Sequence, residues 1–174
     1  MFVIDLVFFI LLLPYISVSA DVCPSDVTGP TCTYEVFFYN ATCANVRAEL
    51  NKRIAGKNGW EDPQVGTYTM LNQAGNDIRI KRVSSSGQEF DIVIWLYQDW
   101  ENCRGEVCSA SVDELVNDDT RQYCNIHDIY CAEEGCNPFE VLQYDESNFS
   151  CKNEESDVTQ KCNAGTSSLV NATY

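Results

Sequence analysis

The chain has 174 residues, of which 26 are acidic and 11 basic, so its formal net charge is −15. Hydrophobic residues make up 45% of the chain and aromatic residues 11%, which excludes disorder along the whole length and predicts one folded domain. So acidic a surface repels phosphate backbones and excludes sequence-independent nucleic-acid binding, whereas basic proteins and cations fit it as partners.

The N-terminal segment predicts export from the cell. Residues 3–16 (VIDLVFFILLLPYI) are apolar but short for a bilayer span, and Val18-Ser19-Ala20 supplies a cleavage site. We therefore expect a signal peptide over residues 1–20 and a secreted mature chain over residues 21–174, with no membrane span after cleavage. Because Asp5 stands where a basic residue is usual, an uncleaved anchor is the alternative.

A strand and a helix are the first elements expected after the cleavage site. Residues 34–39 (YEVFFY) have the composition of a strand. Asn40 or Thr42 fits the N-cap of a helix over residues 41–55, which Gly56 ends. Apolar residues recur along this helix at three- and four-residue spacing: Cys43, Val46, Leu50 and Ile54.

The middle of the chain predicts an antiparallel meander. Strands are expected over residues 66–71, 78–83 and 90–97, separated by turns over 72–76 and 84–87. The last strand (FDIVIWLY) is apolar on both faces and is expected to be central. The basic residues of the second strand are expected to face solvent: Arg79, Lys81 and Arg82. The tryptophans are expected in the core, and the alternative is that they form a ligand-binding face with the tyrosines: Trp60, Trp95 and Trp100.

The C-terminal third predicts a helix followed by loops. Ser111 and Glu114 form a capping box, so a helix is expected to begin there. From Cys136 onward the composition predicts loops held by disulfides, with a loose tail over residues 162–174. The predicted fold is α+β: a small antiparallel β-meander, an N-terminal helix packed on one face, and a disulfide-rich helical or loop C-terminal part.

Ten cysteines in an exported chain predict disulfides. They are Cys23, Cys32, Cys43, Cys103, Cys108, Cys124, Cys131, Cys136, Cys151 and Cys162. Three precede residue 44 and seven follow residue 102, so complete pairing within the chain requires at least one bridge between the two segments. Three Asn-x-Ser/Thr sequons predict N-glycosylation at Asn40, Asn148 and Asn171.

The sharpest chemical motif is Cys124-Asn-Ile-His127-Asp128-Ile-Tyr-Cys131. It resembles the active-site helix of secreted phospholipases A2, in which a cysteine stands three residues before a His-Asp pair and another follows shortly after. The resemblance implies that His127 is a general base that activates water and that Asp128 is a calcium ligand. It covers eight residues, and the family's adjacent second cysteine is replaced by Tyr123. The glycine-rich calcium loop of that family has no counterpart between Cys103 and Ser111.

A structural role explains the same motif. On a helix, the two cysteines and the His-Asp pair share a face at i, i+3, i+4 and i+7, so the cysteines can be staples while the imidazole hydrogen-bonds its neighbouring carboxylate. This interpretation predicts no catalytic residue. A zinc site is not expected either, because exported thiols are oxidised.

Acidic runs such as residues 154–157 are chemically suited to contact with hard cations. We expect weak calcium binding at most, and no resident cofactor or metal.

The sequence predicts a secreted, acidic, disulfide-rich glycoprotein with a non-catalytic role in binding or in building extracellular material. We expect a matrix or surface component, including that of a calcified matrix, whose partners are extracellular proteins, cations or a mineral surface. The alternatives are a small phospholipase A2-type hydrolase that uses His127 and Asp128, and a secreted effector or venom component.

Overall fold

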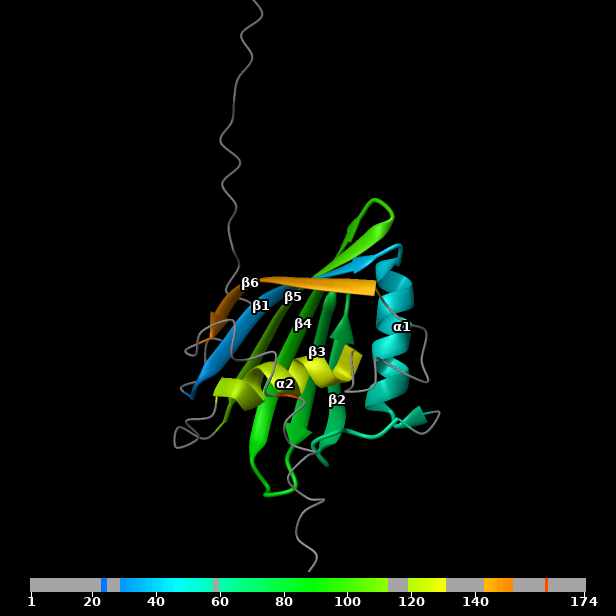
Figure 1. Ribbon diagram of the computed structural model, residues 1–174. Helices are drawn as coiled ribbons and strands as arrows, with labels where there is room; N and C mark the ends of the chain where they lie inside the picture. The colour runs from blue at the N-terminus through cyan, green and yellow to red at the C-terminus, as the bar shows by residue number, and fades with distance from the viewer. Residues whose placement is uncertain are drawn as a thin grey trace, which may run out of the picture.

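In the part of the chain that the structure describes, a six-stranded antiparallel sheet and two helices make up the fold (Figure 1). The computed structural model describes residues 23–24, 29–57, 60–112, 119–130, 143–151 and 162. The elements in chain order are β1 (Thr31–Tyr39), α1 (Cys43–Ile54), β2 (Thr67–Ala74), β3 (Asp77–Val83), β4 (Glu89–Asp99), β5 (Asn102–Ser111), α2 (Asp119–Tyr130) and β6 (Gln143–Cys151). The strand order is β2-β3-β4-β5-β1-β6, so the class is α+β.

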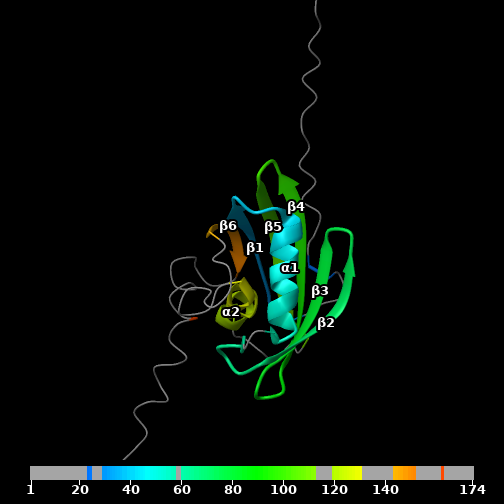
Figure 2. The ribbon, with the colours of Figure 1, turned by 90° about the vertical axis from the view of Figure 1, so that its right-hand side faces the viewer.

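The predicted meander forms as β2 to β5, each strand pairing antiparallel with the next. Phe90, Ile92, Ile94 and Leu96 of β4 alternate along one face of the sheet and are almost completely buried. Both helices cover this face: α2 crosses the strands over β5 and β1, and α1 packs against β5, β4 and β2 (Figure 2). Each of these apolar side chains contributes about 1.5–3 kcal/mol by leaving water.

Helix α1 follows β1 and begins where the sequence predicts. The Thr42 hydroxyl accepts a hydrogen bond from the backbone N–H of Asn45 at 3.2 Å, which makes Thr42 rather than Asn40 the N-cap. Ala55 is the C-cap, and Gly56 follows it at φ 60°, a conformation that glycine adopts readily. Val46 and Leu50 turn toward the sheet and are buried.

Within the described residues, four disulfides tie distant parts of the chain together. They are Cys23–Cys108, Cys32–Cys151, Cys43–Cys103 and Cys124–Cys162. Three of them join the segment before residue 44 to the segment after residue 102, which is the link that the odd cysteine counts require. The bridge Cys32–Cys151 connects β1 to β6, so the first and the last strand of the described chain are neighbours in the sheet.

Two sequence expectations on the strands are wrong, and a third is not tested. Ser111 ends β5 and donates its backbone N–H to the carbonyl of Pro30 at 3.0 Å, and the helix expected from its capping box falls on residues 113–118, outside the described residues. A strand, β6, occupies residues 143–151 where loops were expected, because pairing with β1 supplies the backbone hydrogen bonds. The turn expected over residues 72–76 is shorter, since β2 continues to Ala74 and Gly75 takes φ 57°.

Two side-chain expectations are also wrong. Arg82, expected in solvent, lies on the helix-covered face of β3 and is 1% exposed. Trp100, expected in the core, is 92% exposed, whereas Trp60 is buried. Trp95 is partly buried on the face opposite the helices.

Several predicted features lie outside the described residues. They are the signal peptide over residues 1–20, Glu114, Cys131, Cys136, the acidic run over residues 154–157, Asn171 and the tail after Cys162. Their assignments stay predictions.

Candidate functional site

The predicted His-Asp pair lies on α2, and the helix sends its two side chains in different directions. His127 shares a helix face with Tyr123 and Tyr130, at i−4 and i+3, and this face meets β1 and β6. Asp128 is the next residue and is 3% exposed. Because consecutive helical residues do not face each other, the two predicted functional groups do not form one site by their spacing alone.

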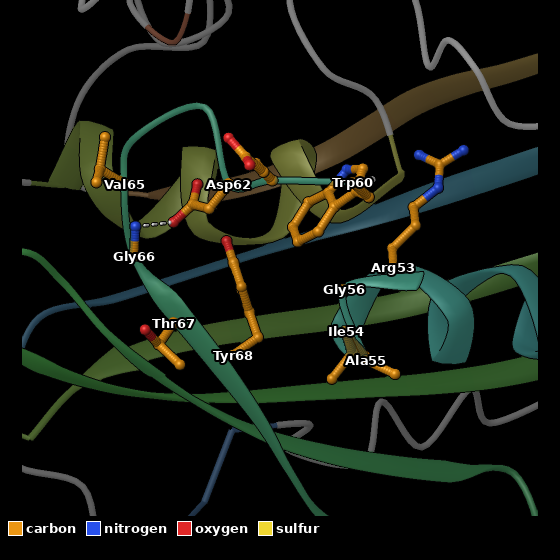
Figure 3. Close-up of a pocket in the computed structure, with 11 residues that line it drawn as sticks. Arg53, Ile54, Ala55, Gly56, Trp60, Asp62, Val65, Gly66, Thr67 and Tyr68 are labelled. Carbon is orange, nitrogen blue, oxygen red and sulfur yellow. Dashed lines mark hydrogen bonds between the residues drawn. The ribbon is translucent and has the colours of Figure 1, made fainter. Parts of the chain in front are cut away.

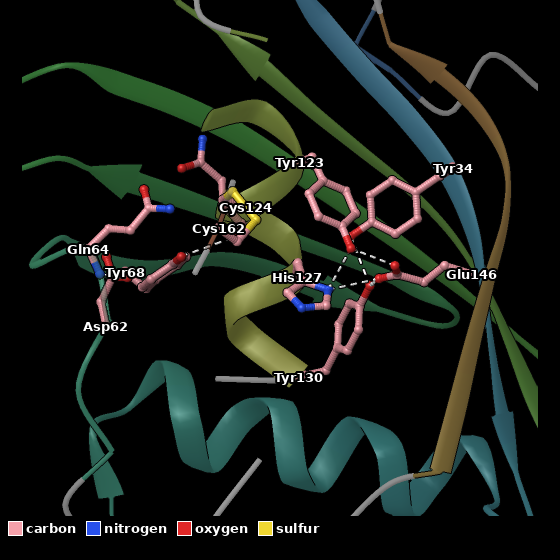
Figure 4. The surroundings of a disulfide bond; sticks show 11 residues. Tyr34, Asp62, Gln64, Tyr68, Tyr123, Cys124, His127, Tyr130, Glu146 and Cys162 are labelled. Atoms are coloured by element: carbon pink, nitrogen blue, oxygen red, sulfur yellow. Dashed lines mark hydrogen bonds and ion pairs between the residues drawn. A yellow bond between two sulfur atoms is a disulfide. The ribbon is translucent and has the colours of Figure 1, made fainter. Parts of the chain in front are cut away.

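Glu146 of β6 is the centre of the cluster that contains His127 (Figure 4). Its Oε1 lies 2.9 Å from Nδ1 of His127, and its Oε2 accepts the Tyr123 hydroxyl at 2.6 Å. The Tyr130 hydroxyl donates to Oε1 of the same carboxylate. Since Tyr123 gives its only proton to Glu146, Nδ1 is the protonated nitrogen and donates both to Glu146 and to the Tyr123 oxygen, 2.9 Å away.

Tyr34 of β1 extends this network to a third element. Its hydroxyl lies 3.0 Å from that of Tyr130, and because Tyr130 donates to Glu146, its oxygen accepts from Tyr34. The ring of Tyr34 stacks on Phe149 of β6 with centroids 5.2 Å apart. We call the group Tyr34, Tyr123, His127, Tyr130 and Glu146 the tyrosine–glutamate cluster. It joins α2, β1 and β6 through hydrogen bonds between buried and partly buried polar groups.

Burial and hydrogen bonding shift the protonation equilibria of this cluster. Burial alone raises the pKa of Glu146, but the hydrogen bond and charge of His127, with the two tyrosine hydroxyls, outweigh it and hold that pKa below its ordinary value. Burial is also the largest cause that raises the pKa of Tyr34, Tyr123 and Tyr130. The carboxylate therefore stays ionised and the phenols stay protonated, which is the arrangement that the hydrogen bonds require.

The imidazole of His127 contacts the carboxylate of a residue that is distant in the sequence. Glu146 is nineteen positions from His127 and supplies the carboxylate that Nδ1 contacts. The spacing of Tyr123, His127 and Tyr130 on one helix face was visible in the sequence and could have suggested a cluster. Glu146 could not have been found, because only the β1–β6 pairing brings it to α2.

A second group of buried polar side chains joins α2 to β5. Asn125 donates to the Ser109 hydroxyl at 3.4 Å, and that hydroxyl donates to Oε1 of Gln122 at 3.0 Å. All three residues are fully buried, so these contacts fix α2 on β5. Within the described part of the chain, no group of three or more His, Cys, Asp or Glu side chains is placed to hold a metal ion.

The sequence did not predict a pocket beside the C-terminal end of α1 (Figure 3). It has a volume of about 460 Å³, and Trp60, Val65, Tyr68 and Ile54 are among its lining residues. Oδ2 of Asp62 accepts the Gly66 N–H at 2.7 Å and pairs with Arg82, which fixes the segment that forms the pocket wall. Val65 stands at the rim with φ 55° and is 74% exposed.

The two sequons within the described residues occupy exposed positions. Asn40 follows β1 at φ 52°, and Asn148 lies in β6 at φ 55°. Both asparagines are exposed to solvent, as an acceptor of a glycan must be.

Comparison of the chain with protein-family models, curated proteins and solved structures finds no match. In the described segments, neither helix has the length and apolar composition needed to cross a membrane. The disulfides are consistent with an extracellular protein.

Proposed function

We propose that this protein is a secreted, acidic, disulfide-bonded glycoprotein that acts by binding other molecules or by building extracellular material. The role we assign is that of a matrix or surface component, including one of a calcified matrix. Export through the signal peptide over residues 1–20 and glycosylation at Asn40, Asn148 and Asn171 belong to the proposal. Four disulfides in the described residues suit a protein that persists outside cells.

The environment of His127 is the observation that carries the non-catalytic part of the proposal. Its Nδ1 lies 2.9 Å from both the Tyr123 hydroxyl and Glu146, inside a network that connects α2 to β1 and β6. A histidine in such a position stabilises the packing of three elements. This geometry favours a structural role over the general-base role that the phospholipase resemblance implies for the same residue.

Hydrolysis assays on the wild type and on His127→Gln test this proposal. We expect no turnover of phospholipid vesicles or of soluble esters in millimolar calcium by either protein, with a secreted phospholipase A2 as the positive control. Activity in the wild type that disappears in His127→Gln, with folding preserved by circular dichroism, would contradict the proposal and support the hydrolase alternative.

Calcium calorimetry tests the calcified-matrix role separately. The net charge of −15 predicts weak binding, with heat released or absorbed at millimolar calcium. No heat at this concentration would contradict the calcified-matrix role. The non-catalytic role is tested separately, by the hydrolysis assays on the wild type and on His127→Gln.

A further inference from the structure

The turn between β4 and β5 presents a tryptophan to solvent. Trp100 and Glu101 connect the paired residues Asp99 and Asn102 in a two-residue turn, which projects at one end of the sheet (Figure 1). Trp100 is 92% exposed and takes φ 53°. Glycine, asparagine or aspartate usually occupies such a position, because a bulky side chain is strained there. The fold gains no buried surface from this tryptophan, so the strain has no evident structural purpose.

Side-chain hydrogen bonds hold this turn in one conformation. The amide nitrogen of Gln98 donates to the carbonyls of Trp100 and Asn102 at 2.8 and 2.9 Å. Its oxygen accepts the backbone N–H of Cys43 at 2.8 Å, and Cys43 is itself joined to β5 by the disulfide to Cys103. A partner that binds Trp100 would therefore lose little free energy in ordering the turn.

Aromatic side chains continue from the turn onto the face of the sheet that the helices leave uncovered. On β1, Phe37 and Tyr39 pack edge to face with centroids 4.9 Å apart, and Tyr39 is 41% exposed. On β4, the rings of Trp95 and Tyr97 stack with centroids 5.9 Å apart. The strand register places Arg104 of β5 between Phe37 and Tyr97. Tryptophan, tyrosine and arginine are the residues most enriched at the energetic centres of protein interfaces.

Acidic side chains are in excess on this face. Among the described residues of β1, β3, β4 and β5 that point to it, the basic ones are Arg79, Lys81 and Arg104, and each forms an ion pair, with Asp77, Glu89 and Glu35 respectively. The remaining acids on this face and in the turn form no ion pair with a basic side chain within the described residues. They are Asp91, Asp99, Glu101 and Glu106. The surface around Trp100 therefore attracts positive charge.

We propose that Trp100 and the aromatic face beside it bind a cationic amphipathic segment of a partner protein. Trp100 contacts the apolar stripe of that segment, and Asp99 and Glu101 attract the Lys or Arg residues that flank the stripe. This inference rests on the proposed binding function and names the chemistry of the partner. A lipid surface is the competing occupant, and the acidic residues on either side of Trp100 disfavour it because cellular membranes carry anionic lipids.

A fluorescently labelled amphipathic Leu/Lys peptide is the probe, and anisotropy in 150 mM NaCl measures its affinity for the full-length protein. The central comparison is between Trp100→Gly and Val65→Gly. Val65 is also exposed, apolar and at positive φ, but it lies beside the pocket at the end of α1, so its variant is a matched control. We expect Trp100→Gly to weaken binding about tenfold or more, and Val65→Gly to leave it unchanged.

Two further variants test the role of the acidic residues beside Trp100 and the role of its side chain separately. Combined Asp99→Asn and Glu101→Gln substitutions should weaken binding and reduce its dependence on salt, and a Leu/Glu peptide should not bind. Trp100→Asn provides a second test of the tryptophan, because asparagine also tolerates positive φ.

Equal peptide affinity of the wild type, Trp100→Gly and Val65→Gly would overturn this inference, as would Trp100-dependent binding to phosphatidylcholine vesicles without binding to the peptide. Neither result affects the proposed non-catalytic role, which fails only if His127-dependent hydrolysis is found. The two proposals can therefore fail independently.

Discussion

The guanidinium of Arg82 and the carboxylate of Asp62 form an ion pair, with Nη2 and Oδ2 2.7 Å apart and both side chains only 1% exposed. Gly66 and Gln64 also donate backbone N–H groups to this carboxylate. The ring of Tyr68 lies 5.5 Å from the guanidinium carbon. The pair thus fixes the segment before β2 against β3, and each charge depends on the other for its compensation.

Arg82→Gln is expected to destabilise the protein by about 3–5 kcal/mol, because it leaves the Asp62 carboxylate buried without its counter-charge. Urea unfolding with the disulfides intact measures this cost. Arg79→Gln on the same strand is the matched control: Arg79 pairs with Asp77 at the surface, and its loss should cost at most about 1 kcal/mol. Similar losses for the two variants would contradict the structural role of the buried pair.

The same residue shows where sequence patterns are insufficient. Local periodicity predicted α1 and the strands of the meander, since their apolar residues repeat at the spacing of a helix or a strand. Arg82 alternates with Ile78 and Ile80, so its position on the buried face follows from the strand period, but its charge suggested solvent. Burial of Arg82 is favourable because Asp62, in the segment before β2, forms an ion pair with it, and local sequence patterns do not reveal this contact.

Contacts between distant segments account for the other differences. The composition of β6 is polar, and its strand conformation depends on pairing with β1, more than a hundred residues earlier. The same pairing places Glu146 against α2, so local patterns indicate the helix face that carries His127 but not the carboxylate that it contacts. Trp100 was assigned to the core because aromatic residues usually are buried, and the position of the turn overrides that tendency.

Stability should depend on pH through Glu146. Its pKa is lower in the folded protein than the ordinary value of 4.5, so the carboxylate adds stability above that value and adds progressively less as the pH falls below it. At pH 6, Glu146→Gln should be less stable than the wild type by about 1–3 kcal/mol, because it removes an ionised hydrogen-bond acceptor.

Urea midpoints measured between pH 6 and pH 3 test this dependence. The difference between the wild type and Glu146→Gln should shrink as the solution is acidified below about 4.5. Asp145→Asn controls for the loss of one negative charge, since Asp145 is the adjacent, exposed residue of β6. A difference that stays constant with pH would show that Glu146 acts through its shape and not through its charge.

Removing Trp100 should not destabilise the fold. Trp100→Gly removes the strain of a left-handed conformation, which stabilises the folded state by about 1–2 kcal/mol. Glycine also has greater freedom in the unfolded chain, and this offsets part of the stabilisation. We expect the free energy of unfolding to be unchanged or raised by up to about 1 kcal/mol, and Val65→Gly to behave alike. A loss above about 2 kcal/mol in Trp100→Gly alone would indicate that the side chain packs within the fold.

The eight paired cysteines predict a thiol count. In denaturant without a reductant, at most two of the ten cysteines should react with a thiol reagent, and none should react if Cys131 and Cys136 are also bonded. Replacing both Cys43 and Cys103 by alanine should lower the free energy of unfolding by about 2–4 kcal/mol, because the unfolded chain without this bridge has the conformational freedom of a long open loop. More than two reactive thiols would contradict the described pairing.

A glycan at Asn148 should keep the outer strand of the sheet from pairing with another molecule. Within the described residues β6 has only β1 as a neighbour, so its other edge offers unpaired backbone groups. Asn148 and Phe149 lie opposite Tyr34 at a shift in the β1–β6 register, and a β-bulge of this kind also disfavours edge pairing. Asn148 is exposed at this bulge, and a bulky glycan there would cover the edge.

Material from a glycosylating host tests this idea by comparing Asn148→Gln with Asn40→Gln. The two asparagines share exposure and nearly the same φ, so both variants carry similar backbone strain, but Asn40 lies in the turn before α1 and not on an edge strand. Each variant should lose one glycan by mass spectrometry, and only Asn148→Gln should form larger species in light scattering at high concentration. Equal self-association of the two variants would show that the bulge and the negative charge of the chain protect the edge without the glycan.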